Sequence, residues 1–384
     1  MSAEYPMFAL SEEHQAVREA VRAVCEAKVA PHAAEVDESG EFPQAAYDAL
    51  AASDFAAPHI GEEYGGAGAD ALATCIVIEE VARACAASSL IPGVNKLGTM
   101  PIILAGSDDL KKKYLSPVAA GTAMFSYCLS EPEAGSDAAA MKTRAVRDGD
   151  GYVLNGVKRW ITNAGVSDYY TVFAVTDPES KQHRISAFVV EKTDEGVSFG
   201  APEKKMGLTG SSTTQVILED VRVPAERLVG AEGDGMKVAL SALDSGRLGI
   251  AACAVGLGQA ALDEAVRYAG QRQQFGQPIG EFQGLQFLLA DMAAAVESAR
   301  ATYLLAARLR DAGRRFSRQA SIAKLVATDA AMKVTTDAVQ VLGGYGYTRD
   351  FPVERYMREA KVTQIFEGTN QIQRLVISRH LLAR

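Results

Sequence analysis

Residue types that mark several common classes of protein are scarce in this chain of 384 residues. The five cysteines are scattered and form no CxxC pair, which argues against a disulfide framework and favours a reducing compartment. The five histidines also lie far apart without an HExxH motif, so we expect no histidine-based metal site. Lys and Arg number 39 against 48 Asp and Glu, and the net charge of -9 argues against a broad nucleic-acid-binding surface.

Signals for membranes and for some widespread enzyme classes are missing as well. No apolar run approaches the ~18–20 residues that a membrane helix needs, and no basic segment followed by an apolar stretch opens the chain. We therefore expect a cytoplasmic protein without a membrane span. The chain has no GxGxxG fingerprint, Walker A loop or GxSxG elbow, which argues against the usual nicotinamide, P-loop and serine-hydrolase sites. Any chemistry must come from carboxylates or from a bound cofactor.

Hydrophobic periodicity divides the chain into three zones. In the first, apolar residues recur at spacings of three and four after Ser11, a potential helix cap. In the second, short runs such as YYTVFAV and ISAFVVE predict strands, and Asp150-Gly151 predicts a hairpin turn. Long apolar stripes at helical spacing return in the third zone and predict a helical bundle. We expect a mainly α protein with a central β domain, divided at residues 1–121, 122–231 and 232–384.

Two segments differ from an ordinary core or surface pattern. The first, YCLSEPEAGSD at 127–137, leaves a predicted strand and enters a loop of small residues. Its N–H and hydroxyl groups could hold a phosphate or an electron-rich ring, or it could be an ordinary surface turn. The second, IFEGTNQ at 365–371, precedes the last helix, for which Thr369 is a natural N-cap. Glu367 beside that helix end could complement the helix dipole or act as a general base.

Both segments resemble signatures of one enzyme family. SEPEAGSD is similar to the first signature of the acyl-CoA dehydrogenases and QIFEGTNQIQR to the second. KRWITN, RQQFG and QVLGGYGY match further segments of that family, in the same order. The resemblance spans essentially the whole chain and is closest in appearance to short- and branched-chain enzymes of bacterial type. It implies a helical N-terminal domain, a β-barrel-like middle domain and a C-terminal four-helix bundle, in agreement with the three zones.

The resemblance also implies an FAD cofactor shared between subunits. Within one subunit, the residues that it assigns to FAD are Tyr127, Leu129, Ser130, Trp160, Ile161, Thr162, Thr369 and Gln371. From a neighbouring subunit, those assigned to the adenine and pyrophosphate half are Arg272, Phe275, Gln283, Gln340, Val341, Leu342, Gly343 and Gly344. Without the family, the single Trp would be assigned to the core, Arg272 to a solvated helix end and the two glycines to a helix terminus.

A substrate site and a reaction follow from the same resemblance. The residues that match family positions for the thioester are Ser136, Asp244, Arg247 and Gly368, of which the Asp–Arg pair could otherwise be a plain surface ion pair. Glu367 is implied to remove the α-proton of an acyl-CoA thioester while FAD accepts the β-hydrogen as hydride, leaving the trans-2-enoyl thioester. Reduced FAD would pass its electrons to an electron-transferring flavoprotein, and the subunits would form a dimer or a dimer of dimers.

Three positions bear on how closely the family pattern applies. Phe366 stands where family members commonly carry Tyr before the implied base. Glu133 stands where they commonly carry glycine, in the loop at 127–137 that is implied to contact the flavin. Gly246 occupies the position at which some relatives carry the base, which leaves Glu367 without a competitor apart from Asp244. Two alternatives stay open: the same chemistry on a thioester held by an acyl carrier protein, and a non-catalytic flavin-binding scaffold. Retention of Glu367 argues against the scaffold and against a flavin oxidase.

Overall fold

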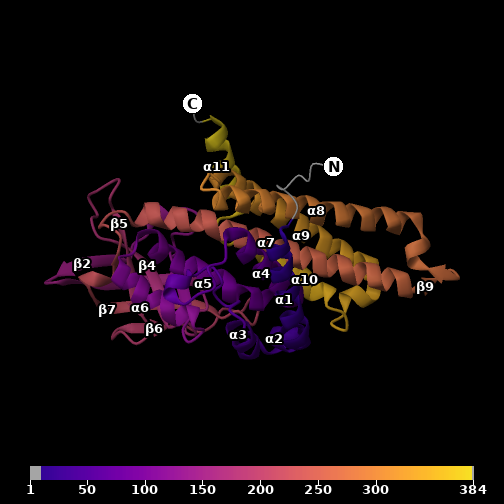
Figure 1. The fold of residues 1–384 in the computed structure, drawn as a ribbon, viewed down its shortest axis with the longest axis horizontal. Coiled ribbons are helices and arrows are strands. Elements are labelled where there is room, and N and C mark those ends of the chain that lie inside the picture. Colours follow the sequence, from indigo (N-terminus) through magenta and orange to yellow (C-terminus); the bar gives the residue numbers. More distant parts are fainter. Residues whose placement is uncertain (1–9, 383–384) are drawn as a thin grey trace.

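A computed structural model describes residues 10–382, and its elements follow the predicted order of helices, strands and helices (Figure 1). The N-terminal helices are α1 (Glu12–Val24), α2 (Ala33–Ser39), α3 (Gln44–Ala51), α4 (Ala71–Ala84), α5 (Ala86–Ala105) and α6 (Asp108–Ala119). Ser11 caps α1 as predicted, because its hydroxyl accepts a hydrogen bond from the His14 N–H at 3.2 Å.

The central zone forms one eight-stranded sheet, which confirms the predicted β domain. Its strands are β1 (Phe125–Cys128), β2 (Arg144–Asp148), β3 (Gly151–Thr162), β4 (Tyr169–Val175), β5 (Ile185–Glu191), β6 (Val197–Phe199), β7 (Thr213–Pro224) and β8 (Leu228–Val229). The strand order is β6-β7-β3-β2-β4-β5-β8, with β1 pairing in parallel with β4. Strand β5 also contacts β7, so the sheet curls around a core of its own.

The hairpin between β2 and β3 turns one residue earlier than Asp150-Gly151, the dipeptide that the sequence suggested. Gly151 already belongs to β3, opposite Asp148, and the two turn residues are Gly149 and Asp150. The reason is conformational: Gly149 has a φ of +62°, the left-handed region that a tight hairpin turn requires and that glycine adopts without strain.

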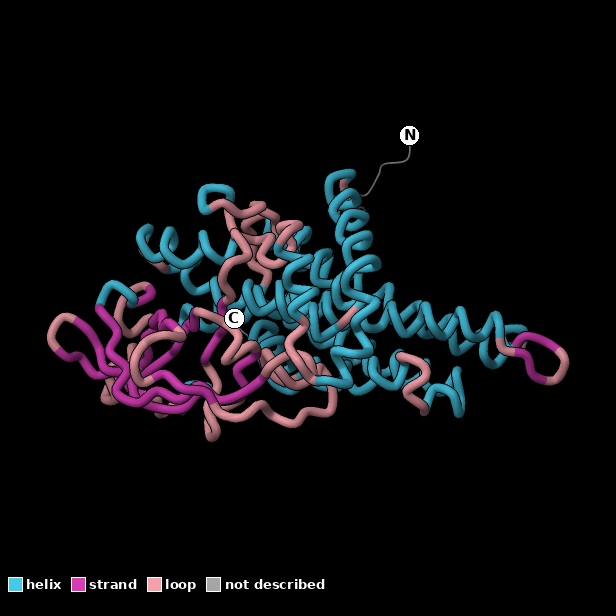
Figure 2. Tube along the Cα trace, turned by 90° about the horizontal axis from the view of Figure 1, so that it is seen from below, coloured by secondary structure: helices cyan, strands magenta, loops and turns pink. Residues whose placement is uncertain are grey.

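The C-terminal zone consists of long helices. They are α7 (Gly235–Gln271), α8 (Gln283–Asp311), α9 (Ser317–Leu342), α10 (Val353–Thr363) and α11 (Asn370–Leu382). Helix α9 packs against the other four helices of this zone, so it forms the centre of the bundle. A short hairpin of β9 (Gln273–Gln274) and β10 (Gln277–Pro278) joins α7 to α8 at the end of the molecule farthest from the large sheet (Figure 2).

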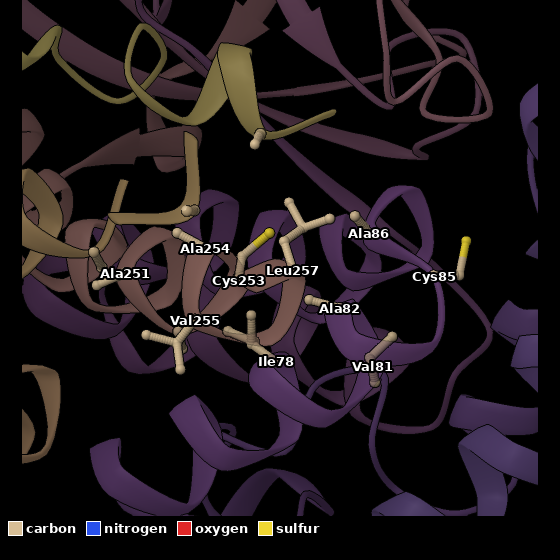
Figure 3. Packing of buried hydrophobic residues seen from close by; sticks show 14 of the residues in the cluster. Ile78, Val81, Ala82, Cys85, Ala86, Ala251, Cys253, Ala254, Val255 and Leu257 are labelled. Atoms are coloured by element: carbon tan, nitrogen blue, oxygen red, sulfur yellow. The ribbon is translucent and has the colours of Figure 1, made fainter. Parts of the chain in front are cut away.

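Helix α7 joins the two helical zones into one core. Its small and aliphatic side chains, among them Ala251 and Leu257, belong to the same buried cluster as Ile78 and Val81 of α4, with which it is in contact (Figure 3). By length and composition alone α7 could cross a membrane, which corrects the expectation that no segment approaches that size. Charged residues interrupt the apolar run in the sequence, so the run appeared shorter than the helix. In the structure 78% of the apolar window is buried inside the protein, as in the core helix of a globular fold.

Candidate functional site

The loop between α10 and α11 presents Glu367. The loop is closed by a hydrogen bond from the Asn370 N–H to the Gln364 carbonyl at 3.0 Å. Thr369 caps α11 as predicted, since its hydroxyl accepts from the Ile372 N–H at 3.2 Å. Glu367 and Gly368 adopt left-handed φ angles of +52° and +90° in succession. For Glu367 this conformation is unfavourable, so the surrounding structure must hold it in place.

The Oε2 end of the Glu367 carboxylate is closely packed between α5 and α7. Its Oε2 atom is buried and has no hydrogen-bond partner among the described residues. Gly246 of α7 approaches it so closely that an added Cβ would overlap Oε2, and the same Cβ would lie 3.1 Å from Leu97 of α5. Phe366, the residue before Glu367, packs against the core. Burial raises the pKa of Glu367 to about 7, a value suited to a general base near neutral pH.

Three cations oppose that rise in the pKa of Glu367: Lys96, Lys324 and Arg247. Arg247 is 4% exposed and donates to Asp244 at 2.5 Å, so this pair is not the plain surface ion pair that the spacing alone allowed. Lys96 of α5 is also buried, and its ammonium donates to the Ser245 carbonyl at 3.2 Å. Lys96 and Lys324 were not identified as site residues from the sequence. Both lysines interrupt apolar helical stripes, which was the one available signal that they are buried.

A buried ion pair shapes the small-residue loop after β1. Lys158 of β3 is fully buried and donates to Glu131 at 2.8 Å and to the Leu129 carbonyl at 3.2 Å. Because the peptide is planar and trans, the Ser130 N–H points away from this lysine. Glu133 forms an exposed ion pair with Lys142 at 2.5 Å, so its extra charge is directed away from the loop interior.

Trp160 lies on the surface beside this loop. Trp160 lies at an irregularity in the pairing of β3 with β7 and has a φ of +63°. The residue is 55% exposed, and the Arg159 guanidinium lies over its ring, 4.5 Å from the centroid. An exposed indole is available for stacking on a planar ligand, which a core tryptophan is not. The Ile161 side chain instead belongs to the sheet core, so only its backbone can face a ligand. Thr162 stays partly exposed next to it.

Tyr127 lies on β1, the strand that leads into the small-residue loop, and close to Glu367. Its hydroxyl donates to the Ala239 carbonyl of α7 at 3.1 Å, and the nearby Glu367 carboxylate contributes to the raised pKa of this phenol. The chain thus brings Tyr127, Arg247 and Gly246 to the same place as Glu367. Ser136 and Gln371 are exposed, with no contact that ties them to this cluster among the described residues.

The remaining candidate residues form a second group at the far end of the molecule. Arg272, Val341, Leu342, Gly343 and Gly344 line a cavity of about 560 Å³, where the Arg272 guanidinium lies 5.6 Å from the Tyr345 ring. Phe275 is 93% exposed on the neighbouring hairpin turn, and Gln283 and Gln340 are exposed as well. Both views place this hairpin far from the eight-stranded sheet (Figures 1 and 2). One chain therefore does not bring the two groups together.

Comparisons with known proteins cover nearly the whole chain. The N-terminal, middle and C-terminal domain models of acyl-CoA dehydrogenases match residues 11–122, 126–221 and 233–382. A probable acyl-CoA dehydrogenase of Mycobacterium tuberculosis, FadE25, is 57% identical over 379 residues, which is 98% of this chain and 97% of that protein.

Solved structures agree in fold over the same length. Butyryl-CoA dehydrogenase from Megasphaera elsdenii has a TM-score of 0.95 and 41% identity, covering 98% of this chain and 99% of that one. A chain from the structural study of the electron transferring flavoprotein of Acidaminococcus fermentans has a TM-score of 0.96 and 44% identity, with 98% and 100% covered. The sequence, the fold and these relatives agree, and the chain belongs to the acyl-CoA dehydrogenase family of flavin-dependent oxidoreductases.

Proposed function

We propose that this protein uses FAD to dehydrogenate a short or branched acyl-CoA to the trans-2-enoyl-CoA, with Glu367 as the base that removes the α-proton. One observation carries the proposal: the Oε2 atom of Glu367 is buried without a hydrogen-bond partner among the described residues, against Gly246 of α7 and next to Leu97 of α5. The family is FAD-dependent, and the exposed indole of Trp160 beside that loop offers a stacking surface that fits an isoalloxazine ring. When bound, FAD would accept the β-hydrogen as hydride.

The chain's own groups would activate the α-carbon. Deprotonation there places negative charge on the thioester oxygen, which needs hydrogen-bond donors aimed at it. The Glu367 N–H has no acceptor among the described residues and is a candidate for this role. The closely packed wall of Gly246 and Leu97 would keep water from the carboxylate, which preserves its basicity toward a weak carbon acid.

Anaerobic addition of acyl-CoAs of graded length and branching, with flavin absorbance as the readout, tests the reaction directly. Butyryl-CoA dehydrogenase is among the similar structures, so we expect four-carbon and short branched substrates to bleach the flavin fastest. Reoxidation is expected with an electron-transferring flavoprotein and not with NAD⁺ or oxygen. Reduction by an acyl carrier protein thioester alone would favour the carrier-bound alternative, and no reduction by any thioester would favour the scaffold.

The rate of flavin reduction should depend on pH through Glu367. The base works only when ionised, and burial places its pKa at about 7. We therefore expect the second-order rate constant at low substrate concentration to rise as the pH increases through about 7 and to level off above it. Stopped-flow measurements across neutrality check this. A rate that falls over the same range would mean that a protonated group, not a carboxylate base, limits the reaction.

We further propose that each FAD bridges two protomers, because the two groups of candidate residues lie at opposite ends of one chain. Replacing Arg272 with Ala removes a guanidinium that can bind two pyrophosphate oxygens through parallel hydrogen bonds, a geometry that Lys does not reproduce. The variant is expected to lose FAD during purification and, since ligand binding stabilises the assembly, to dissociate at higher protein concentration than the wild type. Sedimentation velocity with flavin absorbance measures both, and a monomeric wild type with tightly bound FAD contradicts the shared site.

A further inference from the structure

The backbone of the base loop is held at one carbonyl. The Gly368 carbonyl, directly after Glu367, accepts hydrogen bonds from the Lys324 ammonium and from the Gln373 side-chain amide, both at 2.9 Å. Lys324 and Gln373 are fully buried. Glu367 and Gly368 have consecutive left-handed conformations, which are unfavourable for Glu367. The two hydrogen bonds to the Gly368 carbonyl stabilise the backbone in this conformation.

Lys324 is placed for this contact by the face that α9 turns toward the loop. It donates a second hydrogen bond, also at 2.9 Å, to the side-chain oxygen of Asn370, the first residue of α11. Asn370 in turn donates to Thr328 at 2.9 Å and to Asp329 at 2.7 Å, both on the following turn of α9. The ammonium therefore ties both ends of the segment 368–370 to one rigid helix.

The charge of Lys324 has no direct counterion within ion-pair distance among the described residues. The two oxygens that accept its hydrogen bonds are neutral, although the Glu367 carboxylate is near enough to be the largest influence that favours its charged form. Burial lowers the pKa of Lys324 to about 7, close to that of Glu367. Burying an amine is costly, and a neutral donor would satisfy the same two oxygens at lower cost. What the amine adds over a neutral donor is a positive charge that attracts the Glu367 carboxylate.

We propose that Lys324 is a positioning residue for the dehydrogenation: its ammonium fixes the Gly368 carbonyl and attracts the Glu367 carboxylate, so that the base is both correctly placed and ionised. The inference rests on the proposed role of Glu367. The other charged or titratable groups that face Glu367 among the described residues are Lys96 on α5, Arg247 with Asp244 and Cys253 on α7, and Tyr127 on β1. Among the cations, only Lys324 also holds the loop backbone.

Three variants of the FAD-bound protein separate these roles. Lys324→Met removes the hydrogen bonds and the charge, whereas Lys324→Arg keeps a cationic donor. Lys333→Met is the matched control, because Lys333 is an exposed residue of the same helix whose one ion pair among residues 10–382 is with Asp337. Infrared difference spectra against the corresponding Glu367→Gln background follow ionisation of the Glu367 carboxyl without any substrate.

Lys324→Met is expected to raise the midpoint of Glu367 ionisation by about one pH unit, the effect of losing a nearby opposite charge. It should also slow flavin reduction by butyryl-CoA about 100-fold at neutral pH, as expected for a misplaced base. Lys324→Arg should restore most of both properties, and Lys333→Met should change neither. An unchanged infrared midpoint in Lys324→Met overturns the proposal. If butyryl-CoA and other thioesters fail to reduce even the wild type while the midpoint still shifts, the proposed function fails and the influence of Lys324 on Glu367 stands.

Discussion

Replacing Glu367 with Gln is expected to abolish turnover while leaving the folded, FAD-bound protein intact. The amide has nearly the same shape but cannot accept the α-proton, so flavin reduction should fall by at least the ~10²–10⁴-fold that general-base catalysis supplies. The position on α7 at which some relatives carry a base is Gly246, and the nearby Asp244 is engaged by Arg247, so we expect neither to replace Glu367. Anaerobic stopped-flow spectroscopy with butyryl-CoA measures the loss.

The same variant has a second expected signature in its stability. Burial raises the pKa of Glu367 above its unfolded value, so the ionised side chain destabilises the folded state increasingly as the pH rises from the unfolded pKa toward about 7. Glu367→Gln should therefore raise the melting temperature more above pH 7 than at mildly acidic pH. A variant that reduces its flavin at the wild-type rate would remove Glu367 from the mechanism.

Glu359→Gln is a suitable control for both measurements. Glu359 is a second buried carboxyl, on α10, whose pKa burial raises to about 8 and whose Oε2 atom also has no hydrogen-bond partner among the described residues. The charges that act most on it are Arg355, Asp37, Arg358 and Glu354, none of which acts on Glu367. The same chemical change there should shift the melting temperature in the same direction without slowing flavin reduction by more than a few-fold.

Local signals made parts of the site predictable from the sequence. Helix caps depend on a few neighbouring residues, so Ser11 and Thr369 were identified as N-caps without any tertiary information. The family resemblance then directed attention to Glu367 and Trp160, whose proposed roles rest on a buried, unpartnered Oε2 atom and on an exposed side chain. The exposure of Trp160 in particular runs against the usual burial of a lone tryptophan.

Features that depend on long-range packing could not be predicted in this way. A lysine in a helix looks the same in sequence whether it faces water or a buried carboxylate, so Lys96 and Lys324 went unnoticed. The burial of the pair Asp244–Arg247 was undetermined for the same reason, since its spacing of three suits a surface pair equally well. Likewise, the sequence located the hairpin after β2, but only the backbone conformation of Gly149 fixed the turn.

Gly246→Ala is expected to disable the base without unfolding the protein. A methyl group at this position would overlap the Oε2 atom of Glu367 and lie 3.1 Å from both the Glu367 Cδ and a Leu97 methyl carbon. The carboxylate is the end of a flexible side chain and can move away, so the helix should tolerate the change, and alanine even favours helix by up to about 1 kcal/mol over glycine. The base, however, would be displaced from the thioester, and a shift of about 1 Å costs on the order of 100-fold in rate.

Comparison with Gly270→Ala isolates this steric effect from the general influence of alanine on α7. Gly270 lies in the same helix, and no atom lies within 4 Å of an added Cβ there. Both variants should melt at or above the wild-type temperature, but only Gly246→Ala should show slow flavin reduction, with FAD content unchanged. The infrared signal of the Glu367 carboxyl should also shift in that variant alone, because its surroundings are altered. Full activity in Gly246→Ala would show that the resting position of the carboxylate is not the one from which it takes the proton, and that the loop holding Glu367 must rearrange when a thioester binds.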